Sequence, residues 1–240
     1  MDHTADINMP YSSIAREYLL AEGFPPEQVI KTGSPMYEVL GYYCDLIQAS
    51  DVRSRLHLED YKYFVVSAHR EENVDERERI EKIVKILNIL CERYSYPIIF
   101  STHPRTRKRL DSYGIELHDL VQTMKPLGFP DYVNLQQHAF CVISDSGTIT
   151  EESSILNFPA INLRESHERP EGMEEGVVIM TGLSEDRVLE SIPVAISQKR
   201  NMVRSLEMVA DYYAPNVSEK VLRIIMSYQD YISRRVWYEV

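Results

Sequence analysis

The segment Cys141–Gly172 constrains the fold more than any other part of this 240-residue chain. An apolar, β-branched run at Val142–Ile143 stops at the small polar turn Ser144–Thr148, and a helix-type segment that carries two adjacent acids, Glu151–Glu152, follows. A second short apolar run, Ala160–Leu163, then ends in a charged loop. A strand that feeds a helix through such a turn directs backbone N–H groups and the positive helix end at whatever lies beyond the strand, which suits a phosphate. The segment therefore predicts a strand–turn–helix–strand unit with half of a nucleotide-sugar site at the turn.

Each piece of this segment also has an ordinary structural explanation. A small polar turn before a helix is the usual N-cap signature, and paired acids in a first helical turn are favourable to the helix dipole without any ligand. The spacing of the pieces makes the combination specific, because the acids are placed to accept hydrogen bonds from sugar hydroxyls. An arginine at the end of the second apolar run could close on the same ligand.

Strand-type and helix-type patterns alternate along the whole chain. Strands are expected at Val29–Ile30, Tyr63–Ser67, Pro97–Phe100, Leu120–Gln122 and near Val142, Ala160 and Val177, and helices at 12–23, 36–47, 76–94, 104–113, 131–138, 151–157, 184–206 and 217–235. This alternation predicts an α/β fold with a Rossmann-like parallel sheet and helices on both faces. In such sheets the ligand lies beyond the carboxyl ends of the strands.

Three histidines, His69, His103 and His167, fall at three of the predicted strand ends. A single histidine at a strand end is usually structural, but three at neighbouring ends favour function. The chain lacks H-x-H, H-E-x-x-H and paired cysteines, which argues against a metal site without excluding one. A hydrolase that uses Ser146 as nucleophile is a second alternative, although the G-x-S-x-G turn is missing.

Composition indicates which partners and compartments to expect. The net charge is −11 and the basic residues are scattered, which argues against nucleic acid or an anionic membrane as a partner. No signal peptide and no apolar run approaching about 20 residues is found, so a cytoplasmic protein is expected. The cysteines Cys44, Cys91 and Cys141 are interpreted as reduced core thiols.

Several motifs resemble one family of nucleotide-sugar enzymes. The stretches D-S-G-T-I-T-E-E and R-E-S-H-E-R-P-E are similar to the D-S-G-G-x-x-E-E and R-x-x-T-E-R-P-E signature of the non-hydrolysing UDP-N-acetylglucosamine 2-epimerases. They depart from it at Thr148, where the family usually has glycine, and at His167, where it usually has threonine. The H-R-x-E-N loop at 69–73, the His103-Pro104 pair and the P-L-x-x-x-x-[FY] element at 126–132 match as well.

The resemblance implies a role for each matching residue. By position, the phosphates would lie at Ser146, Gly147 and Thr148, the ribose at Glu152, the diphosphate at Arg169, the uracil at Leu127 and Tyr132, and the sugar near His69 as the active-site histidine, with Arg70, Glu72 and His103 in support. The implied ligand is a UDP-sugar, and the implied reaction inverts C2 by loss and re-addition of UDP without a metal or cofactor.

The resemblance also implies a domain organisation. It begins in the middle of the family pattern, so the chain resembles the C-terminal half of a two-domain GT-B-like epimerase. Residues 1–34 are expected to be an interdomain remnant, 35–215 the UDP-binding domain and 216–240 a crossover helix. A missing N-terminal domain would hold the remaining acid and base groups, so the chain alone is expected to be inactive. An apolar patch at Tyr228, Tyr231, Ile232 and Trp237 would favour a homodimer or bind that domain.

The function predicted from the sequence is therefore UDP-N-acetylglucosamine 2-epimerase or a close relative in surface polysaccharide synthesis. The segment Ala214–Lys220 and the two chain ends resemble the capsule and O-antigen branch, which acts on a 6-deoxy UDP-sugar on the route to UDP-N-acetylfucosamine. Two alternatives stay open: a UDP-sugar-binding module without catalysis, and the nucleotide half of a GT-B glycosyltransferase.

Overall fold

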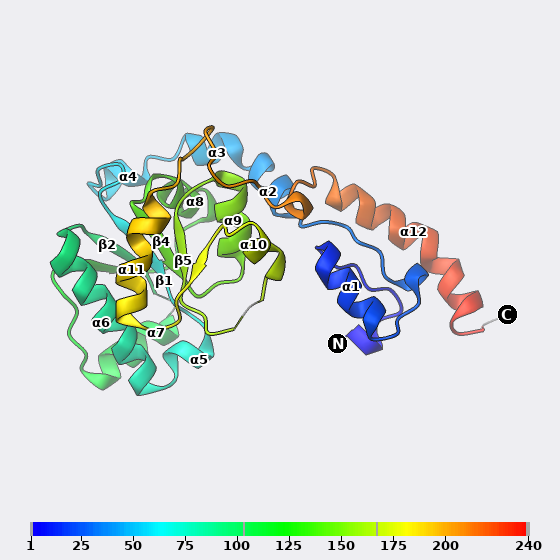
Figure 1. The fold of residues 1–240 in the computed structure, drawn as a ribbon, viewed down its shortest axis with the longest axis horizontal. Helices are drawn as coiled ribbons and strands as arrows, with labels where there is room; N and C mark the ends of the chain where they lie inside the picture. Colours follow the sequence, from blue (N-terminus) through cyan, green and yellow to red (C-terminus); the bar gives the residue numbers. More distant parts are fainter. Residues whose placement is uncertain (1, 103, 167, 239–240) are drawn as a thin grey trace. The chain divides into compact units, whose positions relative to one another are not determined.

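A six-stranded parallel sheet organises residues 43–207 in the computed structural model, which describes residues 2–102, 104–166 and 168–238 (Figure 1). The strands are β1 (Phe64–Ser67), β2 (Ile98–Ser101), β3 (Val121–Met124), β4 (Cys141–Ser144), β5 (Ala160–Asn162) and β6 (Ile179–Met180). Their order in the sheet is β3-β2-β1-β4-β5-β6, and every neighbouring pair is parallel. The predicted α/β Rossmann-like fold is confirmed, and the strand order reverses between β1 and β4.

The central strands form because their side chains are apolar on both faces. Phe64, Val65 and Val66 of β1 are fully buried, and Val65 stands in register with Ile99 on one side and Val142 on the other. Continuous apolar runs of this kind are typical of a parallel sheet that helices cover on both faces. The sequence pattern thus fixes both the strand and its central place.

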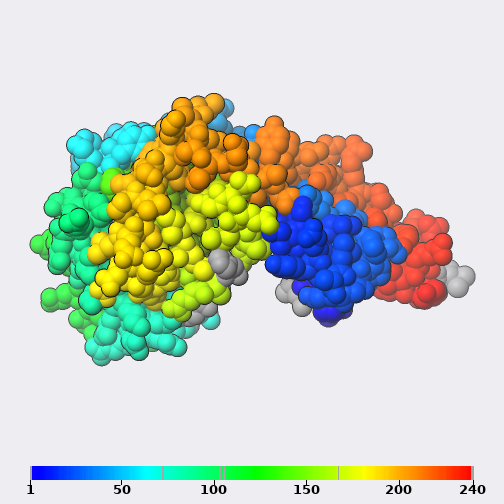
Figure 2. Space-filling view, in the orientation of Figure 1, coloured from blue at the N-terminus to red at the C-terminus, as the bar shows by residue number. Residues whose placement is uncertain are grey.

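Nine described helices accompany the sheet in residues 43–207. They are α3 (Cys44–Gln48), α4 (Val52–Arg55), α5 (Glu71–Val74), α6 (Arg77–Tyr94), α7 (Pro104–Tyr113), α8 (Phe129–His138), α9 (Thr148–Leu156), α10 (Pro170–Glu174) and α11 (Glu185–Ile196). Helices α6 and α11 contact each other, and their apolar faces join the core cluster that contains β1, β2, β4 and β5 residues. In the space-filling view the yellow surface of α11 hides the strands behind it (Figure 2).

The longest of these helices shows how the sequence sets its own limits. Helix α6 buries Ile80, Ile83, Leu87 and Leu90, which recur at the helical period along one face. It ends at Ser95, whose φ of 54° is left-handed and cannot continue an α-helix.

A second compact unit combines residues 1–42 with 208–240 and contains α1 (Ser13–Ala21), α2 (Met36–Tyr42) and α12 (Val217–Arg235). The hydroxyl of Ser12 caps α1 by accepting from the Ala15 amide at 3.2 Å. Gly33 has a φ of +88°, a conformation that favours glycine. A Cβ there would also lie 2.6 Å from the Ala214 Cβ, so only glycine fits where these two segments of the unit meet. The predicted domain boundaries after residues 34 and 215 stay predictions.

Several predicted elements differ from the structure. Val29–Ile30 is not a strand, because Val29 makes one isolated bridge with Asn8 and no ladder extends it. The helix expected over 184–206 ends at Ile196, and the chain then turns through Asn201 at a φ of 58°. Helices α4, α5 and α10 were not predicted, since each is only four or five residues long and shows no period.

Two surface expectations also need correction. Cys44 is exposed, whereas Cys91 and Cys141 are buried as expected. Of the predicted apolar patch on the last helix, Ile232 is buried, while Trp237 is exposed and donates from Nε1 to Asp6 at 3.0 Å. Association through this helix stays a prediction. No helix in the described part of the chain combines the length and the apolar character that a membrane crossing requires.

The close packing of α10 on α9 provides a test of the fold beside the predicted site. A Cβ on Gly172 would lie 2.1 Å from Cγ2 of the buried Thr150. We expect Gly172→Ala to lower the free energy of unfolding by about 1–3 kcal/mol through overpacking. Urea denaturation followed by circular dichroism measures the change.

The second substitution Thr150→Ser removes the clashing methyl group, so the double variant should recover most of the lost stability. Gly41→Ala is the control, because a Cβ there meets nothing within 4 Å. A Gly172→Ala protein as stable as the wild type would show that α10 is not packed as described.

Candidate functional site

The predicted site residues converge at the carboxyl edge of the sheet. His69 and Arg70 follow β1, Leu127 follows β3, Ser146, Gly147 and Thr148 follow β4, and Arg169 lies in the loop after β5. Glu152 belongs to the second turn of α9 and Tyr132 to α8. His103 and His167 lie outside the described residues, and for Glu72 only the backbone, within α5, is described. The edge includes the point where the strand order reverses, the usual place for a ligand in such sheets.

A buried carboxylate joins the two loops at this point. Asp145 is 0% exposed and follows β4, yet it accepts hydrogen bonds from the β1–α5 loop. Its Oδ2 accepts from the backbone N–H groups of His69 at 3.1 Å and Arg70 at 3.0 Å, and from Nδ2 of Asn73 at 3.0 Å. Backbone amides that donate to an ionised carboxylate form strong hydrogen bonds, so Asp145 fixes the course of the H-R-x-E-N loop.

His69 is held with one ring nitrogen toward the protein. Its Nδ1 lies 3.4 Å from both Oδ1 of Asp145 and the hydroxyl of Ser67, while almost half of its side chain is exposed. This orientation leaves Nε2 as the nitrogen that can meet a ligand.

The turn between β4 and α9 is organised by hydroxyl groups. The amide of Ser146 donates to Oγ of Ser144 at 3.1 Å, and Oγ of Ser146 accepts from the Thr148 amide at 3.3 Å and lies 2.9 Å from the Thr148 hydroxyl. The Thr148 hydroxyl also hydrogen-bonds to Glu152. Thr148 stands where the family usually has glycine. Its hydroxyl group links the turn to Glu152, the residue predicted to bind the ribose.

Glu152 is a buried acid that accepts hydrogen bonds from the neutral side chains of Gln136 and Thr148. The pKa of its carboxyl group is raised to about 7, chiefly by burial and also by the charge of Glu151, against hydrogen bonds from Gln136 and Thr148 that lower it. Nε2 of Gln136 donates to Oε2 of Glu152 at 2.6 Å. A buried carboxylate of this kind costs stability, so its position argues for a use in binding.

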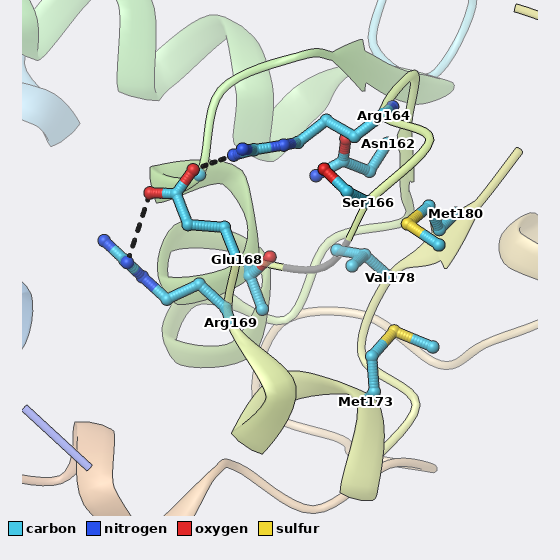
Figure 3. A pocket seen from close by; sticks show the side chains of 10 residues that line it. Asn162, Arg164, Ser166, Glu168, Arg169, Met173, Val178 and Met180 are labelled. Carbon is cyan, nitrogen blue, oxygen red and sulfur yellow. Dashed lines mark hydrogen bonds and ion pairs between the residues drawn. The ribbon is translucent and has the colours of Figure 1, made fainter. Parts of the chain in front are cut away.

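Three arginines surround the carboxylate of Glu168 near the turn between β4 and α9. Arg169 donates from Nη2 to the buried Glu151 at 3.1 Å and from Nη1 to Oε1 of Glu168 at 3.3 Å. Arg70 donates to Oε2 of Glu168 at 3.1 Å, and Arg164 donates to the same oxygen. Figure 3 shows Arg164 and Arg169 reaching the Glu168 carboxylate from opposite sides of the pocket. We call Arg70, Arg164 and Arg169 the arginine basin.

An apolar pocket with a cavity volume of about 360 Å³ lies beside the turn on the β1–β2–β3 side. Its lining consists of Ser67, His69, Ser101, Pro126, Leu127, Phe129 and Tyr132. The hydroxyl of Tyr132 hydrogen-bonds to Ser67, and burial together with the charge of Glu152 raises the pKa of that hydroxyl. An apolar cavity with a few fixed polar groups suits a planar heterocycle.

Three residues of this site were given no binding role from the sequence. Asp145 acts through buried contacts with residues far along the chain, which no local pattern reveals. Glu168 lies close in sequence to Arg164 and Arg169, but its contact with Arg70 spans 98 residues. Phe129 opens α8 and lines the apolar pocket, and its ring also packs edge-on against Tyr43 with the ring centroids 5.4 Å apart. Ser146, the nucleophile in the hydrolase alternative, instead engages Thr148 at the start of α9.

The arrangement places three kinds of group in sequence along one edge. The apolar pocket is followed by the buried acid Glu152 and then by the N-terminus of α9 with the arginine basin. Such a series can hold a ring, then hydroxyl donors, then an anion. Among the described side chains no three of the types His, Cys, Asp and Glu gather as a metal ion would require.

Comparison with known proteins gives a consistent relationship. A family model described as UDP-N-acetylglucosamine 2-epimerase matches residues 1–226. The UDP-N-acetylglucosamine 2-epimerase of Methanocaldococcus jannaschii is 30% identical over 207 residues, which are 83% of this chain and 57% of that protein. The chain thus spans little more than half the length of this relative.

Two solved structures share the fold over nearly the whole chain. The structure of UDP-N-acetylglucosamine 2-epimerase from Rickettsia bellii is 44% identical with a TM-score of 0.90, covering 99% of this chain and 64% of that one. The Methanocaldococcus jannaschii UDP-GlcNAc 2-epimerase in complex with UDP-GlcNAc and UDP is 28% identical with a TM-score of 0.85, covering 94% and 62%. Both the family resemblance and the GT-B-like epimerase fold predicted from the sequence are confirmed.

The raised pKa of Glu152 predicts how stability depends on pH. The folded state holds this proton up to about pH 7, whereas the unfolded chain loses it near 4.5, so ionisation of Glu152 reduces stability as the pH rises through this window. Glu152→Gln removes the penalty. We expect this variant to be more stable than the wild type by up to about 3 kcal/mol above pH 7, with little difference below about pH 5.

Urea denaturation of both proteins across this pH range measures the difference. Glu92→Gln, which removes a carboxylate from the exposed face of α6, controls for the change in net charge. If Glu152→Gln and the wild type lose stability in parallel as the pH rises, ionisation of the buried Glu152 does not cost the stability described.

Proposed function

Because the chain belongs to the UDP-N-acetylglucosamine 2-epimerase family, we propose that it binds the UDP part of UDP-N-acetylglucosamine or a close relative and serves to invert C2 of that sugar. The observation that carries this proposal is the series at the sheet edge: the apolar pocket, then Glu152, then the N-terminus of α9 with the arginine basin. Its order corresponds to the order of base, ribose and diphosphate in UDP.

The nucleotide is proposed to lie along this series. The uracil enters the pocket between Leu127 and Tyr132, where the backbone of the 126–132 segment meets one edge of the base. The ribose hydroxyls donate to Glu152. The phosphates meet the turn Ser146–Thr148 and the first amides of α9, with Arg169 on the diphosphate.

The chemistry follows from the low acidity of the C2 proton. Its removal has to be coupled to the loss of UDP from C1, which gives a glycal, and UDP then returns after a proton arrives on the opposite face. Donors at the turn and the Arg169 guanidinium stabilise the departing diphosphate charge. His69, with Nε2 free to face the sugar, is proposed as one proton-handling group, and the reaction requires a second group on the other face. Arg70 and, on sequence grounds, Glu72 and His103 are proposed as supporting residues. The scheme uses no cofactor.

The sugar is proposed to belong to the 6-deoxy branch used for capsule and O-antigen. This narrower assignment depends on the segment Ala214–Lys220, which departs from the family's glycine-rich entry to the last helix. UDP-N-acetylglucosamine is the reference substrate against which it is tested.

Titration calorimetry with UDP tests the proposal. We expect the wild type to bind UDP, with affinity falling as the pH drops below about 7, because a protonated Glu152 accepts hydrogen bonds poorly from ribose. Glu152→Gln should weaken binding at alkaline pH by about 1.5–3 kcal/mol, the value of hydrogen bonds to a charged group.

Glu92→Gln again serves as the matched charge control, and ADP tests whether the pocket reads the base. Folded protein that gives no heat with millimolar UDP would contradict the proposal. The chain alone is expected to give no exchange of the C2 hydrogen of UDP-N-acetylglucosamine in deuterated solvent, because the second proton-handling group is not among its residues. UDP binding that still gives no exchange after the N-terminal domain of a related epimerase is added would favour the non-catalytic binding module.

A further inference from the structure

The carboxylate of Glu168 occupies the arginine basin. Its Oε2 accepts from Arg70 at 3.1 Å and from Arg164, and its Oε1 lies 3.3 Å from Nη1 of Arg169. Arg70 comes from the loop after β1, whereas Arg164 and Arg169 lie in the β5–α10 loop that also carries Glu168, so two loops converge on one acid. Figure 3 shows the carboxylate between two of them.

The same carboxylate also lies against the start of α9. A Cβ built on Gly147 would be 2.6 Å from Oε1 of Glu168, so the acid reaches the backbone of the turn itself. A negative charge is favourable at the N-terminus of a nine-residue helix. Glu168 therefore accepts hydrogen bonds from the arginine basin and lies beside the positive end of α9.

A bound diphosphate would need this same position. Its oxygens would accept from Arg169 and lie at the start of α9 beside Gly147, where the Glu168 carboxylate now lies. Carboxylate and phosphate cannot share those donors, and at such distances the two negative charges repel each other strongly. The Glu168 side chain is 38% exposed, so it has a route out of the basin into water.

We propose that Glu168 is a built-in competitor for the diphosphate position and thereby determines ligand specificity. The proposal rests on the proposed function, since it assigns the arginine basin to the diphosphate of UDP. Only a ligand with enough charge and enough acceptor oxygens to replace the carboxylate gains the arginines. A neutral nucleoside leaves Glu168 in place, so the basin selects for the diphosphate rather than for the base.

This arrangement makes a prediction of unusual sign. Substitution of an acid that contacts three binding arginines normally weakens a site. Here Glu168→Gln should instead tighten UDP binding on the order of tenfold, because the state in which residue 168 occupies the arginine basin becomes less populated. The affinity for uridine, which carries no phosphate, should not change. The gain should shrink at high ionic strength, where exposed charges are screened.

Titration of wild type and variant with UDP and with uridine tests the proposal, with circular dichroism to confirm folding. The matched control is Glu165→Gln, which removes the same charge from the same loop but pairs with Arg79 outside the basin. It should leave UDP affinity near the wild-type value.

Equal or weaker UDP binding by Glu168→Gln would overturn the proposal and make Glu168 a residue that positions the arginines. If this variant fails to fold, Glu168→Asp withdraws the carboxylate by one methylene and should tighten binding in the same direction, and an unchanged affinity would be equally contradictory. Failure of the wild type to bind UDP at all is a separate result, which counts against the proposed function.

Discussion

The hydrogen bonds that Asp145 accepts are the interaction on which the geometry of the site depends. This fully buried acid at the end of β4 accepts from the backbone of His69 and Arg70 and from the side chain of Asn73. Asn73 in turn accepts from Arg79 at 2.9 Å, so the connection extends to the start of α6. One fully buried carboxylate thus fixes the backbone that carries the His69 and Arg70 side chains.

The same edge of the sheet carries features that stability alone would not select. Glu152 is buried with a pKa raised to about 7, and three arginines converge on Glu168 beside a helix N-terminus. Gln136 adds to this cost, since its side-chain oxygen is buried with no partner among the described residues. A ligand that brings hydroxyl donors to Glu152 and anionic oxygens to the arginines would relieve these costs. Folding and binding are thus coupled through the same side chains.

Most of the fold and part of the site could be predicted from the sequence. The strands were found because β1, β2 and β4 are short apolar runs, and Ser146, Gly147 and Glu152 were found because their spacing after β4 matches a family signature. The short helices α5 and α10 escaped because a single turn has no period. The role of Asp145 escaped because its partners lie 72 to 76 residues away. The role of Glu168 escaped because Arg70 lies 98 residues away, and only the assembled sheet brings such residues together.

The account is tested most directly by the UDP affinity of an Asp145→Asn protein. In either orientation the asparagine NH₂ group would face a donor: the His69 amide at the Oδ1 position, or Arg70 and Asn73 at the Oδ2 position. The β1–α5 loop would therefore lose part of its anchor although no ligand contact is removed. Calorimetry on folded variant should show UDP binding weakened by on the order of tenfold or more, through loss of preorganisation. Binding of UDP by Asp145→Asn with wild-type affinity would contradict the claim that this buried carboxylate builds the site.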